Sequence, residues 1–328
     1  MFIKQQSPTI PLQSQPIKMT HHSYVGSGPY CYANSFAMVM GAEAPSTAVL
    51  EFATCSPFGM QVVGKELVFF DPFGWDPTQA FDDMLTAAGW TSKLTIGKDA
   101  DDALACLQRE LRQGPVFAGP LEMGYLGYHP GNKGPMGADH YVVVLGIDGD
   151  GLRLRLHDPH GFPYASIPVS EFLRAWRTDS LGYGTSYTMR SEFRRVRVFT
   201  EEEVIRRSLP NARRWLGMGA VEAGSMPPGS CGNASATDRL AEIIQTNFHP
   251  GVRNPLVYFA VRVGARRLAD GATCMERIGY ADAAGVMARQ AQLVGGLQYP
   301  LVAGDTAGAV EILRELGPTY DELKAALG

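Results

Sequence analysis

The stretch DHYVVVLGID, residues 139–148, constrains the fold of this chain more than any other. Its apolar run at 141–147 is too short to span a bilayer and is typical of a strand buried on both faces. LRLRLHDP follows at 152–159, after Asp148-Gly149-Asp150, which suits a tight turn. The pattern predicts an antiparallel β-hairpin that carries His140 at the mouth of its first strand.

Alternation along the second strand places its acidic residue on the apolar face. Leu154, Leu156 and Asp158 point to one side of the strand, and the arginines between them point to the other. A hairpin loop of three residues pairs position 140 with 158, so that His140 faces Asp158 directly. A loop of two residues would shift the register by one and separate them. Because a carboxylate on an apolar face needs a partner, we expect the His140 imidazole to provide it.

Cys31 lies in the segment GSGPYCYANSFAMVMG, directly after a Gly-Pro turn. Apolar residues at helical spacing predict a helix from Cys31 to Met40, with Gly41 at its C-cap. The positive end of a helix dipole lowers the pKa of a thiol there and favours the thiolate. A single cysteine is more often a buried apolar group, but a histidine paired with an aspartate favours a nucleophile.

Cys31, His140 and Asp158 follow the logic of papain-like thiol enzymes, with the nucleophile on a helix and the base and its orienting carboxylate on a hairpin. In that scheme Cys31 attacks an acyl carbon, His140 takes and returns the thiol proton, and Asp158 orients the imidazole. A Gly- and Tyr-rich segment leads into His140 and could form a pocket wall. Its candidate substrate-binding residues are Met123, Tyr125 and Tyr128.

The sequence changes character near residue 200. Residues 21–199 mix strand and helix patterns, which predicts an α+β domain with an antiparallel sheet. Thr200 and the glutamates after it are typical of a capped helix start, and helical patterns then recur through 200–328. Residues 1–20 are polar and lack the apolar core of a signal peptide, which predicts a flexible N-terminal tail and a cytoplasmic protein.

Composition excludes several classes of protein. The net charge of −4 argues against a general attraction to nucleic acid. The five cysteines are an odd number without a C-x-x-C pair, which argues against a disulfide framework and a structural zinc site. We therefore expect no metal ion, no cofactor, no nucleic acid and no membrane among the partners.

Two short motifs suggest other chemistry. GMQVVGKE at 59–66 has the G-x-x-x-x-G-K core of a phosphate loop, but Glu66 replaces the Ser or Thr that would bind magnesium. HDPH at 157–160 could join His140 in a metal site, although Pro159 would disturb the strand. We expect neither motif to carry the function.

The segments PLEMGYLGYHP, GADHYVVVLGID, LHDPHGFPYASIP and SEFLRAW together resemble the butirosin biosynthesis protein H family. Members of that family look like relatives of the peptidases that remove double-glycine leader peptides. The resemblance implies a papain-like core over residues 21–199, followed by a mostly helical C-terminal domain. It also implies that Cys31 is the nucleophile, His140 the base and Asp158 the third member of a triad.

The activity that this resemblance implies is acyl transfer in secondary metabolism. An acyl carrier protein would present the acyl group as a phosphopantetheine thioester, and an amine or internal nucleophile on a small molecule would accept it. A cysteine peptidase, amidase or thioesterase of the same fold is the alternative. Arginines near the domain junction could dock an acidic carrier, although a solvated basic helix face would explain them equally well. They are Arg194, Arg195, Arg197, Arg206, Arg207, Arg213 and Arg214.

The chain departs from the family pattern just before the cysteine. Tyr30 stands where the family is expected to have a histidine, and no glutamine lies between Gln15 and Cys31 to complete an oxyanion hole as in the leader peptidases. Tyr24, Ser27 or the backbone are the candidates to replace that donor.

Overall fold

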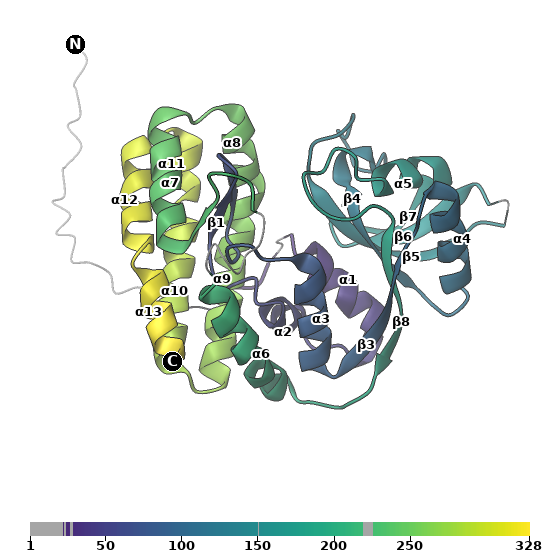
Figure 1. The fold of residues 1–328 in the computed structure, drawn as a ribbon, viewed down its shortest axis with the longest axis horizontal. Helices are drawn as coiled ribbons and strands as arrows, with labels where there is room; N and C mark the ends of the chain where they lie inside the picture. The colour runs from purple at the N-terminus through teal and green to yellow at the C-terminus, as the bar shows by residue number, and fades with distance from the viewer. Residues whose placement is uncertain (1–21, 23, 27–28, 150, 219–225) are drawn as a thin grey trace, which may run out of the picture.

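A computed structural model describes the chain outside residues 1–21, 23, 27–28, 150 and 219–225 (Figure 1). The predicted tail over 1–20 and the candidate Ser27 lie outside the described residues. Over the rest, the chain is α+β, with antiparallel sheets and a helical C-terminal region, as the sequence predicts. Among these residues, no helix combines the length and the apolar character needed to cross a bilayer.

A six-stranded antiparallel sheet organises the residues before 200. Its strands, in spatial order, are β3 (Trp90–Ile96), β8 (Thr188–Arg195), β4 (Val116–Glu122), β5 (Asp139–Ile147), β6 (Arg153–Asp158) and β7 (Phe162–Pro168). The predicted hairpin is therefore formed by β5 and β6. β5 is central, which explains its almost uninterrupted apolar run.

The two faces of β5 contribute to different hydrophobic clusters. Tyr141 packs into a cluster with α1 (Cys31–Met40), α2 (Thr47–Ala53) and α3 (Pro77–Ala88). Val142 and Val144 pack on the other face with α4 (Ala100–Glu110) and α5 (Val169–Trp176). Consecutive residues at the start of β5 therefore face different surroundings.

The helix α1 runs from Cys31 to Met40, and Gly41, whose φ is 69°, lies at its C-cap, as the sequence predicts. Its Ser35 hydroxyl donates a hydrogen bond of 3.2 Å to the carbonyl of Tyr141. The Phe36 ring stacks on Phe117 of β4 with centroids 4.3 Å apart. These contacts fix α1 across the sheet at β4 and β5.

The C-terminal region is helical and opens with a capping box at Thr200 and Glu203, as the acidic helix start predicts. Its helices are α6 (Glu201–Leu216), α7 (Asn233–Thr246), α8 (Pro250–Pro255), α9 (Val261–Arg277), α10 (Ala281–Gly296), α11 (Gln298–Ala303), α12 (Thr306–Leu316) and α13 (Thr319–Leu327). A π-helical turn, Leu256–Ala260, leads into α9.

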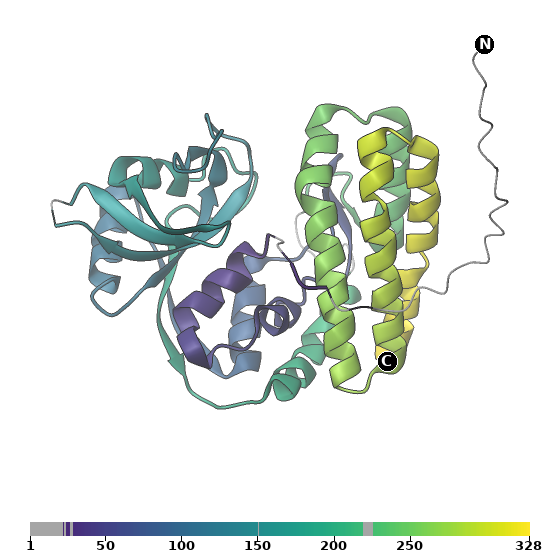
Figure 2. The same ribbon diagram turned by 180° about the vertical axis from the view of Figure 1, so that it is seen from behind.

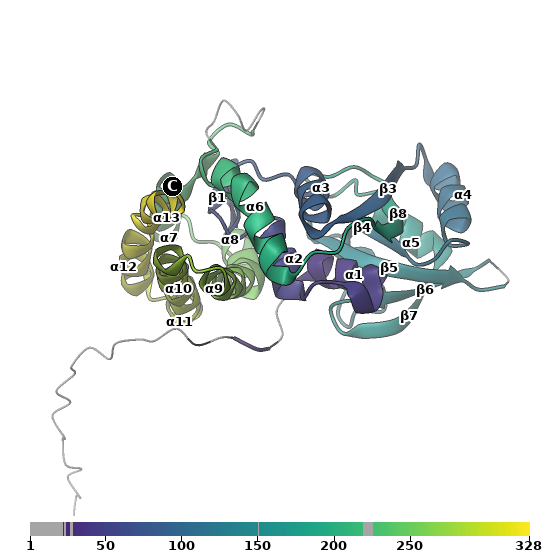
Figure 3. The same cartoon turned by 90° about the horizontal axis from the view of Figure 1, so that it is seen from below.

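Residues on both sides of position 199 share one core. A single buried cluster runs from Tyr30 to Leu327 and includes residues of α1, α2, α3 and the C-terminal helices. A small sheet, β2-β1-β9, also joins β1 (Gln61–Val63) and β2 (Leu67–Phe69) to β9 (Cys231–Gly232). Figures 2 and 3 show α1, α2 and α3 between the larger sheet and the C-terminal helices. The domain division at residue 199 stays a prediction.

The predicted register of the β5–β6 hairpin is wrong by two residues. Val143 pairs with His157 and Val144 with Leu156, and continuation of this register puts Asp158 opposite Val142 rather than opposite His140. The loop is longer than three residues. The Asp148 carbonyl accepts a hydrogen bond from the Gly151 N–H, and the Asp148 N–H donates one to the Arg153 carbonyl. Next to the loop, the register differs from the predicted one by an odd number of residues, which would put His140 and Asp158 on opposite faces. One extra residue in β5, between Val144 and Gly146, changes this difference to two residues. His140 and Asp158 therefore still share a face, as diagonal neighbours.

Candidate functional site

His140 and Asp158 form a buried pair at the start of the β5–β6 hairpin. His140 Nε2 lies 2.8 Å from Asp158 Oδ1, and both residues are buried. The predicted contact is present despite the shifted register, because a diagonal neighbour on the same face remains within reach of an imidazole.

Asp158 accepts hydrogen bonds from three further donors. His129 Nε2 lies 2.6 Å from Oδ2, the Tyr128 hydroxyl 2.9 Å from the same oxygen, and the His160 N–H 2.6 Å from Oδ1. Burial alone would raise the pKa of Asp158, but the hydrogen bonds from His129 and His140 outweigh it and hold that pKa well below its usual range. Asp158 is therefore ionised at neutral pH.

An ionised carboxylate can only accept hydrogen bonds, and this determines the tautomer of both histidines. His129 and His140 each donate Nε2–H to Asp158, so the lone pair of each neutral ring lies on Nδ1. The Nδ1 atom of His140 is the nitrogen with which this residue can take a proton.

His129 is the site residue that the sequence analysis missed. It follows Tyr128 in the loop after β4, and its ring stacks on His160 with centroids 5.4 Å apart. The sequence contained a signal for it, because His129 directly follows Tyr128, which was already a candidate for the pocket wall, and a histidine can titrate and bind polar groups. The segment contributes to the site through these two consecutive side chains.

Cys31 lies beside the start of β5, on the face opposite to Val142. Its thiol is close enough to Asp139 and Tyr141 to influence their electrostatics. The hydrogen bonds among the described residues include none between the Cys31 thiol and His140. The structure thus places Cys31 near the two residues that flank His140 in the sequence, whereas alternation along β5 directs the His140 side chain to the other face of the sheet, with Val142 and Asp158.

The expected lowering of the Cys31 pKa is not found. Burial raises the pKa of the Cys31 thiol well above its usual range, and the negative charges of Asp139 and Glu51 raise it further. The positive charge of Arg267 opposes them only partly. The helix start alone does not make a thiolate here, so proton removal requires a base.

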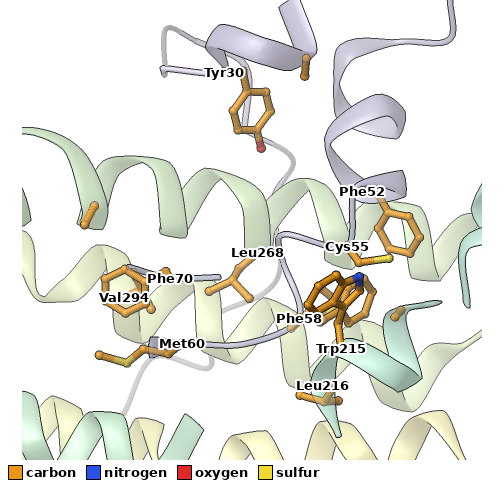
Figure 4. Packing of buried hydrophobic residues seen from close by; sticks show 14 of the residues in the cluster. Tyr30, Phe52, Cys55, Phe58, Met60, Phe70, Trp215, Leu216, Leu268 and Val294 are labelled. Atoms are coloured by element: carbon orange, nitrogen blue, oxygen red, sulfur yellow. The ribbon is translucent and has the colours of Figure 1, made fainter. Parts of the chain in front are cut away.

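Tyr30 and Tyr32, the residues on either side of Cys31, both form hydrogen bonds with side chains of α9. The Tyr30 hydroxyl donates to Asp270 Oδ2 at 2.9 Å, and the Arg266 guanidinium lies 3.7 Å from the Tyr30 ring centroid. Figure 4 shows the Tyr30 ring directed from the start of α1 toward the C-terminal helices. The residue that stands in place of the expected histidine is therefore a structural contact to α9.

A buried ionic network surrounds Tyr32 on the other side. Arg267 donates from Nε to Glu51 Oε1 at 2.6 Å and from its terminal nitrogen to the Tyr32 hydroxyl at 2.7 Å. Tyr32 in turn donates to Glu51 Oε1 at 2.6 Å, and Asp71 lies 3.5 Å from the guanidinium. This network holds the first turn of α1, α2 and α9 together.

The remaining candidate substrate-binding residues behave differently from one another. Tyr128 reaches the site through Asp158. Tyr125 lies under the Arg174 guanidinium at 4.0 Å, against α5, and Met123 binds Ala138 and Asn132 through its backbone. Tyr24 is exposed, with its hydroxyl close to Gly26. The oxyanion donor stays a prediction.

Six of the seven junction arginines make intramolecular side-chain contacts. Arg206, Arg207 and Arg213 donate to backbone carbonyls of Ile278, Ala87 and Leu327. Ion pairs join the following partners: Arg194 to Glu192, Arg195 to Glu43 and Arg214 to Asp83. These side chains hold α6 and the end of β8 in place, which explains their clustering without a docking partner.

One group of described residues has the composition of a metal site. His129, His140 and Asp158 each offer a ligand atom, and these atoms lie within 4.8 Å of one another. Both His–Asp distances are also those of hydrogen bonds, and the expectation that no metal binds here stays a prediction. The phosphate-loop motif has no helix after its glycines, since β1 is followed by a turn and β2.

Comparison with known proteins relates part of the chain to YobF. Residues 227–328 match the family described as the YobF C-terminal domain. The uncharacterized protein YobF of Bacillus subtilis (strain 168) is 34% identical over 163 residues, which make up 49% of this chain and 52% of YobF. The chain thus spans about half the length of the curated relative that it matches. The helix α9, which contacts Tyr30 and Tyr32, lies within the matched C-terminal region.

Proposed function

We propose that this protein is a cysteine-dependent enzyme that transfers acyl groups through a thioester on Cys31. The observation that carries the proposal is the buried contact of 2.8 Å between His140 and Asp158, on a strand that packs against the helix begun by Cys31. An imidazole held by a buried carboxylate is the base that a thiol nucleophile needs.

In the proposed reaction, Cys31 Sγ attacks the carbonyl carbon of the donor while its proton passes to Nδ1 of His140 by way of a water molecule, because β5 directs His140 to the face of the sheet opposite to Cys31. Nε2–H of His140 stays on Asp158, whose negative charge stabilises the imidazolium. The leaving group departs with the proton, and a thioester joins Cys31 to the acyl group. A second nucleophile then gives its proton to His140 and attacks that thioester, which releases the product and the thiol.

The protonated resting state of Cys31 favours an activated acyl donor. Burial and the acidic neighbours raise the pKa of the thiol, so the thiolate forms only as His140 takes the proton. A carrier-protein thioester on a phosphopantetheine arm suits this site, because its thiolate leaving group departs easily. An amine or an internal nucleophile on a small molecule would accept the acyl group. Hydrolysis, by a peptidase, amidase or thioesterase of this fold, is the alternative if water is the acceptor.

The test is acylation of the protein by an acyl-phosphopantetheinyl carrier protein, followed by intact mass spectrometry. The wild-type protein should gain the mass of one acyl group, and Cys31→Ala should gain none. Cys231→Ala is the matched control, because Cys231 is also partly exposed and lies away from the β5–β6 hairpin. An adduct that persists in Cys31→Ala would exclude Cys31 as the nucleophile, and peptide cleavage without any adduct would favour the hydrolase.

A further inference from the structure

A cavity of about 180 Å³ lies between β2 and α8, the helix beside the small sheet in Figure 1. Its apolar floor is formed by Val68, Val252 and Leu256, which are all buried. Of the described residues that line it, Glu66 and His249 alone have polar side chains. An apolar cavity of roughly 150 Å³ is enough to hold a molecule of the size of benzene. The cavity can therefore hold a short organic chain with one polar end.

Hydrogen bonds determine the tautomer of the histidine at the cavity. The Gly251 N–H donates to Nδ1 of His249 at 3.1 Å, so this nitrogen presents its lone pair and the ring proton lies on Nε2. The Nε2–H donates to Glu66 Oε2 at 3.0 Å, and Asn247 Nδ2 donates to Glu66 Oε1 at 2.6 Å. A second ring proton, on Nδ1, would break the bond from Gly251. In this arrangement His249 gives Glu66 a hydrogen bond but no positive charge.

The negative charge of Glu66 is not balanced by a cation of the chain. Among the described residues, no lysine or arginine forms an ion pair with it. Two arginines of the neighbouring helices are engaged elsewhere: Arg239 pairs with Glu242 at 2.6 Å, and Arg253 donates to two backbone carbonyls of α11. Each carboxylate oxygen of Glu66 has a further lone pair besides the one its hydrogen bond uses. A carboxylate at the edge of an apolar cavity is complementary to a ligand that joins a cation to an apolar body.

We infer that this cavity binds a small organic ammonium ion, with the ammonium group on Glu66 and the alkyl chain against Val252 and Leu256. The residue that departs from the phosphate-loop motif thereby has a role, because its charge attracts an amine and repels a phosphate. The inference does not rest on the proposed function, since the described residues that line the cavity include no member of the proposed triad. The wall that α8 contributes lies within the region that matches the YobF C-terminal domain.

The test compares binding of n-butylammonium chloride with binding of n-butanol, a neutral molecule of the same length, to the full chain at equal ionic strength. Titrations followed by methyl NMR give the affinity and the place of binding together. Both probes should shift the methyl signals of Val252 and Leu256 to saturation. The ammonium ion should bind about fivefold more tightly than the alcohol, as expected for one partly exposed ion pair. Equal affinities for the two probes, or no saturable shift of these signals, would overturn the inference.

Two variants separate the charge of Glu66 from the total charge of the protein. Glu66→Gln keeps the length of the side chain and an acceptor oxygen, so it should lose the preference for the ammonium ion while its affinity for n-butanol, which reports an intact cavity, stays the same. Glu242→Gln is the matched control, because Glu242 is an exposed carboxylate of α7 that does not line the cavity. An unchanged preference in Glu66→Gln, or an equal loss in Glu242→Gln, would contradict the assignment of the ammonium group to Glu66.

Discussion

Arg267 of α9 and Glu51 of α2 form a buried ion pair, with Nε and Oε1 2.6 Å apart. Both side chains are almost fully buried, and Glu51 Oε2 has no hydrogen-bond partner among the described residues. Desolvation of the two charges is costly, so the pair depends on the presence of both partners.

Replacement of Arg267 by Met should lower the free energy of unfolding by about 3–5 kcal/mol, because it leaves Glu51 buried without its cation. Urea unfolding of the full chain measures the loss. Adding Glu51→Gln to Arg267→Met should recover part of it, since the stranded charge is removed. Arg289→Met, which breaks an exposed pair with Glu322, should cost less than about 1 kcal/mol. Equal losses for the buried and the exposed pair would contradict this account.

Asp139→Asn should make Cys31 more reactive at neutral pH. Asp139 raises the pKa of the Cys31 thiol through its negative charge, so removing that charge lowers the pKa and increases the thiolate fraction. The rate of iodoacetamide alkylation of Cys31 at pH 7.5–8 should rise by roughly three- to tenfold. Tyr183, which donates to Asp139 at 2.6 Å, can donate to the Asn oxygen in the same way. A slower reaction in the variant would show that Asp139 is not an opposing charge.

His129 should act as a positioning residue for Asp158. His129→Phe keeps a ring against His160 and Phe162 but removes the donor to Asp158 Oδ2, whereas His129→Gln retains a donor. We expect Cys31 acylation to fall by about tenfold in the Phe variant and to be largely retained in the Gln variant. The NMR signal of the His140 ring N–H should move in the Phe variant alone. Identical effects of both substitutions would indicate packing rather than hydrogen bonding.

Asp158 should make folding sensitive to acid. The pKa of Asp158 in the folded protein lies below its ordinary value of about 3.9 in an unfolded chain. Its contribution to stability is therefore complete above pH 4 and is lost as the pH falls toward the folded pKa. Between pH 4 and 2, the free energy of unfolding should fall more steeply for the wild type than for Asp158→Asn. Parallel pH profiles for the two proteins would rule out a depressed pKa at Asp158.

The local features of the site follow from the sequence because short-range patterns determine them. The helix start at Cys31, the burial of Asp158 and the identity of both hairpin strands come from periodicity and turn residues. The contact between His140 and Asp158 was predicted correctly from an incorrect register. Parity determined the face on which each side chain lies, and parity was unaffected by an error of two residues.

The non-local features could not be predicted in this way. No pattern near Cys31 indicates that Tyr30 and Tyr32 contact residues of α9, about 240 positions later in the chain. Burial raises the pKa of Cys31 most, and the charges of Asp139 and Glu51 raise it further, so the rule for helix starts gave the wrong direction. His129 was missed because a loop without periodicity does not reveal where its side chains point.

The extra residue between Val144 and Gly146 changes what a deletion in this strand would do. Deletion of one residue from a buried central strand normally moves every side chain that precedes the deletion to the other face of the sheet. Loss of Leu145 would instead make the ladder regular and leave Val144 opposite Leu156. In an alignment of homologues, a gap at Leu145 is therefore compatible with an intact histidine–aspartate pair, whereas a gap at Val142 would place the histidine on the wrong side of the sheet.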